Sequence, residues 1–317
     1  MKAHEQRGRR WDLAHLRAAD LGRVWLHASP SIRPRVAAEL ELPLLDSLEA
    51  LPAAAETLVV AGGGTLIDRA KRFRQGARPG LQLIAIATIW GSGAEVSPIA
   101  VLNGEAGKEI HFGEDLIPDH YVAWPELARS VPAARLRHAC GDVWAHGLEA
   151  FTSPLASDTI RRDAAELINE MAGFELGYDP RWFEAGAAAC LLQARSSVGL
   201  VHGFAHVLEA PLAAAHPDAG WGHARLCSTF LLPVLGFNRM RSPKVETIAA
   251  EYGLDLSRIE LVADALFDAA DYDAAMALAA EHWGNIARDR CSRTNCNLVR
   301  RDSLEFFQHF RGSPVTS

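Results

Sequence analysis

Four residues in the second half of the chain have side chains that could bind one metal ion. Asp142 and His146 are four residues apart in GDVWAHGLEAF, so on a helix both would project from the same face. His202 and His223 follow, in VHGFAH and GHARLCSTF. Three imidazoles and one carboxylate suit Fe(II) or Zn(II) and are poorly suited to Mg or Ca. If these four side chains converge, the chain is a metalloenzyme.

A second group of residues has the form of a phosphate-binding turn. The segment TLVVAGGGTLIDRAK passes from an expected strand through Gly62 to Thr65 into an expected helix. Glycines let a phosphate approach the backbone, and the helix N-terminus supplies free N–H groups. A triple glycine also serves as a plain turn. A second turn, Gly91 to Gly93, follows the next apolar run, and turns at two successive strand ends favour a dinucleotide across the sheet's carboxyl edge.

The elements that would position these groups change in character near residues 130–137. Before this point, β-rich runs at 23–28, 57–61 and 83–88 alternate with helix-like stretches at 32–40 and 66–74, as in a parallel α/β sheet. After it, helix-periodic stretches dominate. These stretches are 157–173, 182–197, 245–252, 259–269, 272–290 and 303–310. The sequence therefore predicts an α/β dinucleotide-binding domain, residues 1–135, and an all-helical metal-binding domain, residues 136–317.

Composition narrows the class of protein. The net charge of −7 argues against a nucleic-acid partner, and the short, broken apolar runs predict no membrane span. The basic run from Arg69 to Arg74 is interpreted as a solvated helix face. The N-terminus lacks the apolar stretch of a secretory signal, and five scattered cysteines indicate reduced thiols, so we expect a cytoplasmic protein. Cys291 and Cys296 are too loosely spaced to predict a zinc pair.

Taken in order, these segments resemble the iron-dependent (group III) alcohol dehydrogenase superfamily. The family pattern GGGSxxDxAK is matched by GGGTLIDRAK at 62–71, and PTTxGTGSEV is matched loosely by ATIWGSGAEV at 87–96. The pattern GxDALxHxxE is matched by CGDVWAHGLE at 140–149, with Asp142, His146 and Glu149 in place. VHGFAH and LLPVLGFN also match, and TNCN at 294–297 resembles the remnant of a C-terminal NPR.

The resemblance implies the dehydroquinate synthase-like fold of this superfamily, in which a Rossmann-like parallel sheet holds a nicotinamide dinucleotide and an all-α domain holds the metal. It implies Asp142, His146, His202 and a further histidine as ligands. Family spacing, about fourteen residues after the third ligand, would select His216. The segment that follows aligns only if His223 is the ligand and roughly seven residues are inserted, so we favour His223.

The resemblance also implies roles for other residues. The expected cofactor-binding residues are Gly62, Gly63, Gly64, Thr65, Asp68, Thr88, Ser92, Ser97 and Lys108. His206, one turn from His202, is the expected catalytic proton relay. Glu149 either orients a ligand imidazole or forms an interdomain ion pair. The family's NAD-selecting aspartate is absent after the first strand, which ends His27-Ala28-Ser29, and this favours NADP(H) over NAD(H).

The resemblance thus implies a metal-dependent (Fe²⁺ or Zn²⁺), NAD(P)-linked oxidoreductase that interconverts an alcohol and an aldehyde or ketone by hydride transfer, and we expect a homodimer. The chain is short for the family and carries an insertion at 217–222, which suggests a specialised biosynthetic enzyme acting on a small aldehyde or the hydroxyl of a modified peptide. Two alternatives stay open. One is a sugar-phosphate cyclase of the dehydroquinate synthase type, and the other is a non-catalytic relic of the fold.

Overall fold

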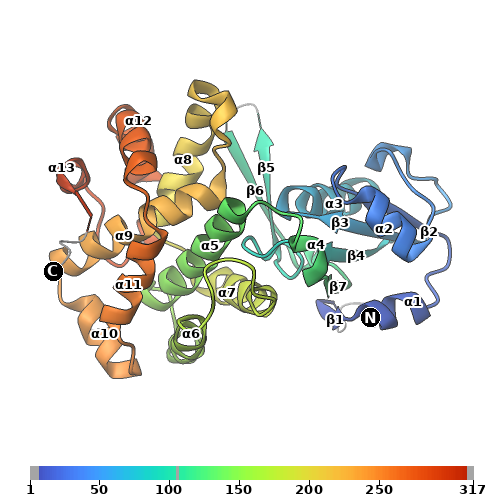
Figure 1. Cartoon of the computed structure of the whole chain (residues 1–317), viewed down its shortest axis with the longest axis horizontal. Helices are drawn as coiled ribbons and strands as arrows, with labels where there is room; N and C mark the ends of the chain where they lie inside the picture. The colour runs from blue at the N-terminus through green and yellow to red at the C-terminus, as the bar shows by residue number, and fades with distance from the viewer. Residues whose placement is uncertain (1–6, 105–106, 313–317) are drawn as a thin grey trace. The chain divides into compact units, whose positions relative to one another are not determined.

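A computed structural model describes residues 7–104 and 107–312 of the chain (Figure 1). The chain forms two compact units, Met1–Val131 and Pro132–Ser317. The division lies four residues before the predicted boundary, because helix α5 (Ala133–Thr152) already begins there, with Pro132 at its N-cap. A boundary after residue 135 would have cut the first turn of this helix.

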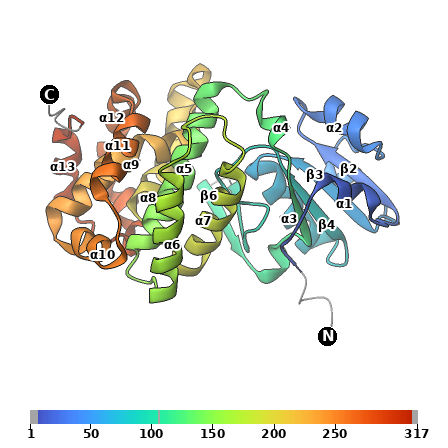
Figure 2. The same ribbon diagram turned by 60° about the horizontal axis from the view of Figure 1, so that its bottom comes forward.

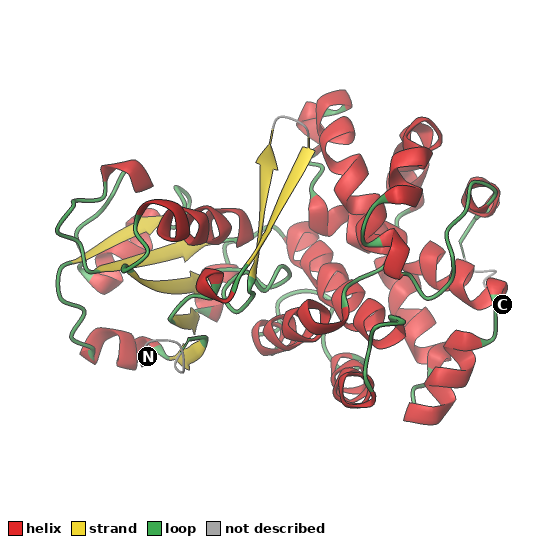
Figure 3. Ribbon diagram, turned by 180° about the vertical axis from the view of Figure 1, so that it is seen from behind, coloured by secondary structure: helices red, strands yellow, loops and turns green. Residues whose placement is uncertain are grey.

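The first unit is built on a five-stranded parallel sheet with the strand order β1-β7-β4-β3-β2 (Figure 3, yellow). Its strands are β1 (Arg9–Trp11), β2 (Val24–Ala28), β3 (Thr57–Gly62), β4 (Gln82–Ala87) and β7 (His120–Ala123). Its helices are α1 (Leu13–Ala18), α2 (Arg33–Leu40), α3 (Gly64–Ala77) and α4 (Pro125–Ala128), with short 3₁₀ turns η1 (Leu48–Ala50) and η2 (Glu114–Leu116). The predicted α/β class is confirmed, whereas β1 and β7 were not predicted.

The central strands are buried on both faces, and their alternate residues enter two separate cores. Val59 and Ala61 of β3 pack with Val36 of α2 on one face. Leu58 and Val60 pack with Ile67 and Ala70 of α3 on the other. Because successive strand residues point to opposite faces, the unbroken apolar run at 57–61 covers both faces of the sheet at once. This packing fixes α3, and therefore the glycine turn that precedes it.

An antiparallel hairpin, β5 (Ile99–Gly104) with β6 (Gly107–Phe112), is anchored to α3 by a buried charge pair. The Lys71 ammonium donates to Asp68 Oδ1 at 3.0 Å, to the carbonyl of Ala94 at 3.0 Å and to that of Ile99. The other Asp68 oxygen accepts from the backbone N–H of Val101 at 3.0 Å. This network holds the hairpin and the loop after β4 against α3.

The basic run on α3 is not the solvated face that its composition suggested. Arg69 is exposed, but Lys71 and Arg74 are fully buried. The Arg74 guanidinium donates to Asp119 Oδ2 at 3.0 Å and to the carbonyl of Ile117 at 2.8 Å. That interpretation was therefore wrong for Lys71 and Arg74. Apart from Asp68, their acceptors lie in segments some 23 to 45 residues away in sequence, and a run of charged residues gives no sign of such distant acceptors.

The second unit is helical throughout its described residues (Figures 1 and 2). Its longer helices are α5, α6 (Asp158–Met171), α7 (Trp182–Ser196), α8 (Leu200–Ala215), α9 (His223–Arg241), α10 (Lys244–Tyr252), α11 (Leu256–Leu266), α12 (Ala269–Arg288) and α13 (Ser303–His309), with 3₁₀ turns η3 (Pro217–Ala219) and η4 (Ser292–Thr294). Helix α5 packs against α6, α7 and α9 and is buried on all sides from Ala139 to Phe151. Each polar side chain on a helix that is buried on all sides needs a bonding partner in the interior.

Among the described helices, none alone is both long and apolar enough to cross a membrane. Helices α7 and α8 meet that criterion together, with a bend of 102° between them.

Candidate metal centre

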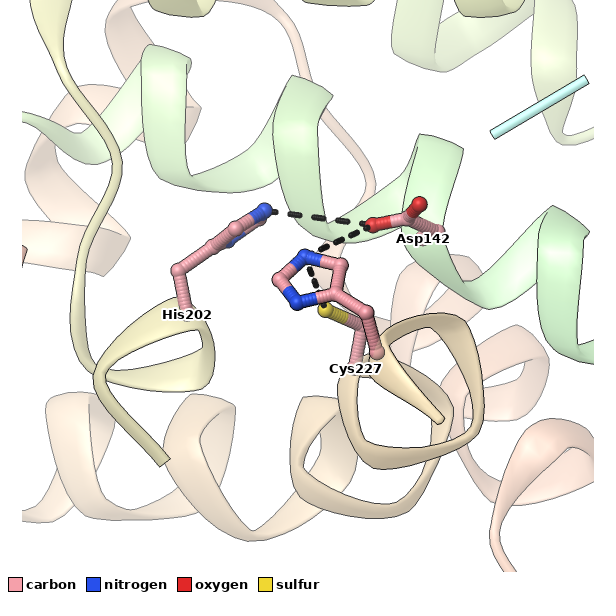
Figure 4. A group of neighbouring side chains, drawn as sticks. Asp142, His202 and Cys227 are labelled. Atoms are coloured by element: carbon pink, nitrogen blue, oxygen red, sulfur yellow. Dashed lines mark hydrogen bonds and ion pairs between the residues drawn. The ribbon is translucent and has the colours of Figure 1, made fainter. Parts of the chain in front are cut away.

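Three helices of the second unit bring their donor side chains to one point. Asp142 and His146 come from α5, His202 from α8, and His223 from the first turn of α9. Cys227 of α9 joins them one turn after His223 (Figure 4). Donor atoms of Asp142, His202, His223 and Cys227 all lie within 4.8 Å of one another.

The individual separations define a compact set of donors. Asp142 Oδ1 lies 3.8 Å from His202 Nε2 and 3.8 Å from His223 Nε2. His223 Nε2 lies 3.6 Å from Cys227 Sγ. The His146 ring stacks on the His202 ring, with centroids 4.6 Å apart. The structure thus brings together the four residues predicted as ligands and adds a cysteine.

Several of these donors have buried atoms that the protein leaves unsatisfied. Among the described residues, Asp142 Oδ1, His146 Nδ1 and His202 Nε2 are buried without a hydrogen-bond partner. An unpaired polar atom in a protein interior is destabilising by about 1–3 kcal/mol, so three of them in one cluster require a partner from outside the chain. A divalent cation with nitrogen and oxygen ligands fits this donor set.

His202 and His223 have the protonation state that ligation needs. Burial lowers the pKa of His202 well below its usual value, and the neighbouring His146 lowers it further. Burial also lowers the pKa of His223 strongly, although Asp142 opposes this. For Asp142, burial would raise the pKa, but His146, His223 and His202 bring it below its usual value. The lowered pKa values of Asp142, His202 and His223 therefore favour one carboxylate beside two neutral imidazoles near neutral pH.

Glu149 orients His202 rather than donating to the cluster. Its Oε2 lies 2.7 Å from His202 Nδ1, and its Oε1 accepts from the backbone N–H of Val201 at 2.6 Å. Burial raises the pKa of Glu149 to about 7, against backbone hydrogen bonds from Gly199 and Val201 that lower it. Of the two roles left open for Glu149, the structure shows the one that orients an imidazole.

The start of α8 is fixed from two sides, which places His202. Asn295 Oδ1 accepts from the N–H of Leu200 at 3.3 Å, beside the Glu149 contact to Val201. Asn295 is in turn paired with Asn238 of α9 through two amide hydrogen bonds, of 2.7 and 3.2 Å. A Cβ on Gly199 would lie 2.9 Å from Glu149 Oε1 and 3.0 Å from Asn295 Oδ1. Glycine is therefore needed at position 199. Through Asn295, the TNCN segment connects the start of α8 to α9.

The alternative histidine, His216, lies elsewhere. It is exposed at the C-cap of α8, whereas His223 begins α9 after the 3₁₀ turn Pro217–Ala219. The inserted residues therefore form the connection between the two helices, and it is His223 that reaches Asp142 and His202.

His206 belongs to a second cluster beside the first. Its Nδ1 lies 3.7 Å from Asp289 Oδ1 and 3.7 Å from Cys291 Sγ. The Asp289 carboxylate also accepts from the backbone N–H of Cys291 at 2.8 Å. Burial would raise the pKa of Asp289, but the contact with His206 lowers it below its usual value. Asp289 was not anticipated, because it is 83 positions from His206 and no local spacing links them.

Cys227 was also missed by the sequence reasoning. It is fully buried, and burial raises the pKa of its thiol well above the usual value, to which Asp142 and Glu149 contribute. A signal did exist, since Cys227 follows His223 by four residues, the same spacing that drew attention to Asp142 and His146.

In the first unit, the glycine turn packs tightly against its neighbours. A Cβ on Gly62 would lie 2.5 Å from Ser29 Oγ, and one on Gly64 would lie 2.3 Å from Ser92 Oγ. The two predicted turns thus meet at the carboxyl ends of β3 and β4. At Gly63 the situation differs, because a Cβ would meet only Ile89 Cγ2, at 3.7 Å, and φ of −81° suits any residue.

The other predicted cofactor residues fall into two groups. Thr65 and Ser92 are exposed at this edge of the sheet, and Lys108 of β6 is partly exposed. Asp68, Thr88 and Ser97 are buried. Ser97 Oγ accepts from the N–H of Ile99 at 3.1 Å, and both Asp68 oxygens are engaged by Lys71 and Val101. Asp68 and Ser97 therefore hold the hairpin and the loop in the structure.

Comparison with known proteins gives a family-model match in the first unit and partial matches to curated relatives. Residues 44–125 match the family model described as iron-containing alcohol dehydrogenase. A 1-propanol dehydrogenase of Salmonella typhimurium is 29% identical over 192 residues, which cover 56% of this chain and 51% of that protein. An alcohol dehydrogenase of Thermococcus barophilus is 28% identical over 233 residues, or 63% and 58% of the two chains. The chain spans about half the length of the curated relatives it matches.

Solved structures share the fold over almost the whole chain. An iron-containing alcohol dehydrogenase from Thermococcus thioreducens superposes with a TM-score of 0.73 at 22% identity, covering 96% of this chain and 98% of that one. A sulfoacetaldehyde reductase from Bifidobacterium kashiwanohense, solved in complex with NAD⁺, gives a TM-score of 0.71 at 16% identity and covers 96% of each chain.

Proposed function

The chain belongs to the iron-containing alcohol dehydrogenase superfamily, and from that premise we propose that it is a metal- and nicotinamide-dependent oxidoreductase that interconverts an alcohol with an aldehyde or ketone. The observation that carries the proposal is the convergence of buried donors from α5, α8 and α9, three of whose atoms have no partner among the described residues. Such a cluster would be destabilising in a protein that did not bind a cation there.

Asp142, His146, His202 and His223 would hold the ion. The ion would supply a Lewis acid for the substrate oxygen, and a nicotinamide would supply or accept the hydride. Glu149 keeps the His202 ring oriented with Nε2 toward Asp142. Both Fe²⁺ and Zn²⁺ are compatible with the imidazole and carboxylate ligands.

The turn at Gly63 is where the protein best fits the pyrophosphate of a nicotinamide cofactor. Neither backbone conformation nor internal packing requires glycine at this position, in contrast to Gly62 and Gly64. Close approach of a ligand is then the remaining reason for the missing side chain. The N-terminus of α3 begins at the next residue, without a side-chain cap, so its N–H groups are placed to bind phosphate oxygens.

His206 would move the proton of the substrate hydroxyl. It lies one turn from His202 in α8, with ring centroids 6.1 Å apart, and its side chain is about a tenth exposed. An imidazole that touches solvent can pass a proton outward near neutral pH. Asp289, 3.7 Å away, is placed to hold the ring in position.

The finer parts of the proposal concern cofactor, substrate and assembly. We propose NADP(H) over NAD(H), because Ser29 follows β2 at the position of the family's NAD-selecting aspartate. We further propose a specialised biosynthetic substrate, either a small aldehyde or the hydroxyl of a modified peptide, in a cytoplasmic homodimer. The insertion at 217–222 supports a specialised member.

The test pairs metal analysis with cofactor titration on matched glycine variants. The purified protein is expected to retain about one equivalent of Fe²⁺ or Zn²⁺ per chain and to bind a nicotinamide dinucleotide, measured by calorimetry. Gly63→Ala should weaken dinucleotide binding with a stability change below about 1 kcal/mol, measured by chemical denaturation. Retention of neither metal nor dinucleotide would refute the proposal.

Gly64→Ala provides the matched control, because its Cβ would clash with the Ser92 side chain. This variant should lose stability as well as affinity, and the additional change Ser92→Gly should restore the stability. Unchanged dinucleotide affinity in Gly63→Ala would show that this turn does not hold the pyrophosphate.

A further inference from the structure

Cys227 places a sulfur atom among the nitrogen and oxygen donors of the metal centre. Its Sγ lies 3.6 Å from His223 Nε2 and belongs to the set whose donor atoms are mutually within 4.8 Å. The residue is one helical turn after His223 on α9, so both side chains leave the same face of the helix. Figure 4 shows Cys227 beside the contacts that join Asp142 and His202.

The spacing of the donors has the dimensions of a tetrahedral site. Metal–donor distances of about 2.0–2.3 Å place the corners of a tetrahedron about 3.3–3.8 Å apart. Three separations fall within or at the edge of this range, namely 3.8 Å from Asp142 to His202, 3.8 Å from Asp142 to His223, and 3.6 Å from His223 to Cys227. The thiol therefore lies at the separation from His223 that a shared ion requires, and within 4.8 Å of the Asp142 and His202 donors.

We propose that Cys227 Sγ is a ligand of the metal ion, together with Asp142, His202 and His223, and that the sulfur makes this centre select zinc over ferrous iron. The inference rests on the proposed function, since it concerns the same metal centre. Thiolate is a soft ligand that favours zinc over metals bound through oxygen and nitrogen alone. Binding requires the thiolate, so the thiol proton leaves for solvent when the ion binds.

The two negative ligands also change the charge of the centre. Asp142 and the Cys227 thiolate together neutralise a divalent cation, whereas Asp142 with three neutral imidazoles leaves one positive charge. A catalytic zinc ion can expand from four to five ligands, so four protein ligands leave room for a substrate oxygen as the fifth. In this arrangement Cys227 takes the place that the proposed function gives to His146, and His146 remains stacked on His202 beside the ion.

The test uses cobalt as a spectroscopic substitute for zinc in the full-length protein. The metal is removed by chelation and replaced by Co²⁺, and absorption is recorded for wild type, Cys227→Ser and Cys291→Ser. A sulfur ligand gives a charge-transfer band in the near ultraviolet, in addition to the visible bands of a tetrahedral ion. Cys291→Ser is the matched control, because Cys291 is a buried cysteine in the neighbouring His206 cluster.

We expect the near-ultraviolet band in wild type and Cys291→Ser and its loss in Cys227→Ser, with the visible bands retained. In an anaerobic competition between Zn²⁺ and Fe²⁺, Cys227→Ser should shift the bound ratio toward iron. Visible bands without the near-ultraviolet band in wild type, or a band that survives in Cys227→Ser, would overturn the inference and leave the metal centre standing. If wild type bound none of Co²⁺, Zn²⁺ and Fe²⁺, both this inference and the proposed function would be overturned.

A second measurement does not depend on the folding of a variant. X-ray absorption of the wild-type zinc protein should show a sulfur scatterer at about 2.3 Å, beyond the nitrogen and oxygen shell at about 2.0–2.2 Å. A shell of nitrogen and oxygen alone contradicts the inference.

Discussion

Glu149 Oε2 lies 2.7 Å from His202 Nδ1 in the interior of the helical unit, while the other Glu149 oxygen accepts from the N–H of Val201. An ionised Glu149 requires that Nδ1 donate its proton, and the lone pair of the second ring nitrogen, Nε2, is then free. That nitrogen points toward Asp142, 3.8 Å away. One buried carboxylate therefore fixes both the ring orientation of His202 and the tautomer that can bind a cation.

Replacing Glu149 by glutamine should weaken metal binding without removing a ligand. The amide oxygen can still accept from the Val201 N–H, which turns the amide N–H₂ toward His202 Nδ1. The imidazole must then carry its proton on Nε2, where the cation binds. We expect metal affinity to fall about 10- to 100-fold, measured by competition with a chromophoric chelator.

Glu166→Gln on α6 is the control, since this glutamate is exposed and lies on a helix that supplies none of the donors. It should bind metal as wild type does. Equal affinities for Glu149→Gln and wild type would mean that Glu149 has no influence on the His202 tautomer.

Glu149 also predicts a pH dependence of stability in the metal-free protein. Burial raises the pKa of Glu149 from 4.5 to about 7. Between these two pH values, Glu149 is protonated in the folded state and ionised in the unfolded state. The contribution of Glu149 is therefore fully present below pH 4.5 and is lost as pH rises through about 7. The loss, on the order of 3 kcal/mol, should appear in chemical denaturation of chelated wild type relative to Glu149→Gln. A constant difference between the two proteins from pH 4.5 to 7.5 contradicts the prediction.

The parts of the fold that the sequence revealed are those encoded locally. Strands β2, β3 and β4 are short apolar runs bounded by polar or glycine residues, and α6, α7 and α12 have clear helical periodicity. Strands β1 and β7 contain three and four residues, too few to show a period. Their pairing depends on partners distant in the chain.

The same distinction applies to the site. Asp142 and His146 are recognisable by their spacing within one helix, and His202 by the motif around it. Asp289 is recognisable only when the segment after α12 is placed beside α8, whereas Cys227 had a local signal in its spacing of four residues from His223. The burial of Lys71 and Arg74 was hidden for the same reason, because their acceptors lie in other segments.

The choice between His223 and His216 can be tested by metal content. His223→Ala removes a donor 3.8 Å from Asp142 Oδ1, whereas His216 is exposed at the end of α8. We expect His223→Ala, His202→Ala and Asp142→Ala to lose bound metal during dialysis, measured by mass spectrometry of the metal. His216→Ala should retain it. Metal loss in His216→Ala together with retention in His223→Ala would show that His216 is the ligand and that no insertion precedes it.

The Lys71–Asp68 pair should be needed for stability rather than for cofactor binding. Lys71→Met leaves the Asp68 carboxylate buried beside the hairpin without its 3.0 Å ammonium partner. Removing one member of a buried pair is destabilising by about 3–5 kcal/mol. Chemical denaturation should show this loss, and the additional change Asp68→Asn should recover part of it. If Asp68→Asn alone instead weakened dinucleotide binding and left stability unchanged, Asp68 would be a cofactor ligand.

Asp289 should act through His206, as a positioning residue. Its carboxylate lies 3.7 Å from His206 Nδ1, and its removal leaves the imidazole free to turn away from the substrate proton. Asp289→Asn is expected to lower kcat about tenfold or more with KM and metal content unchanged, and Asp289→Glu should recover part of the activity. Asp264→Asn, an exposed aspartate on α11, is the matched control and should leave kcat unaltered. An effect confined to proton transfer changes kcat alone. Loss of metal or a raised KM in Asp289→Asn would therefore show that Asp289 maintains the structure of the site instead.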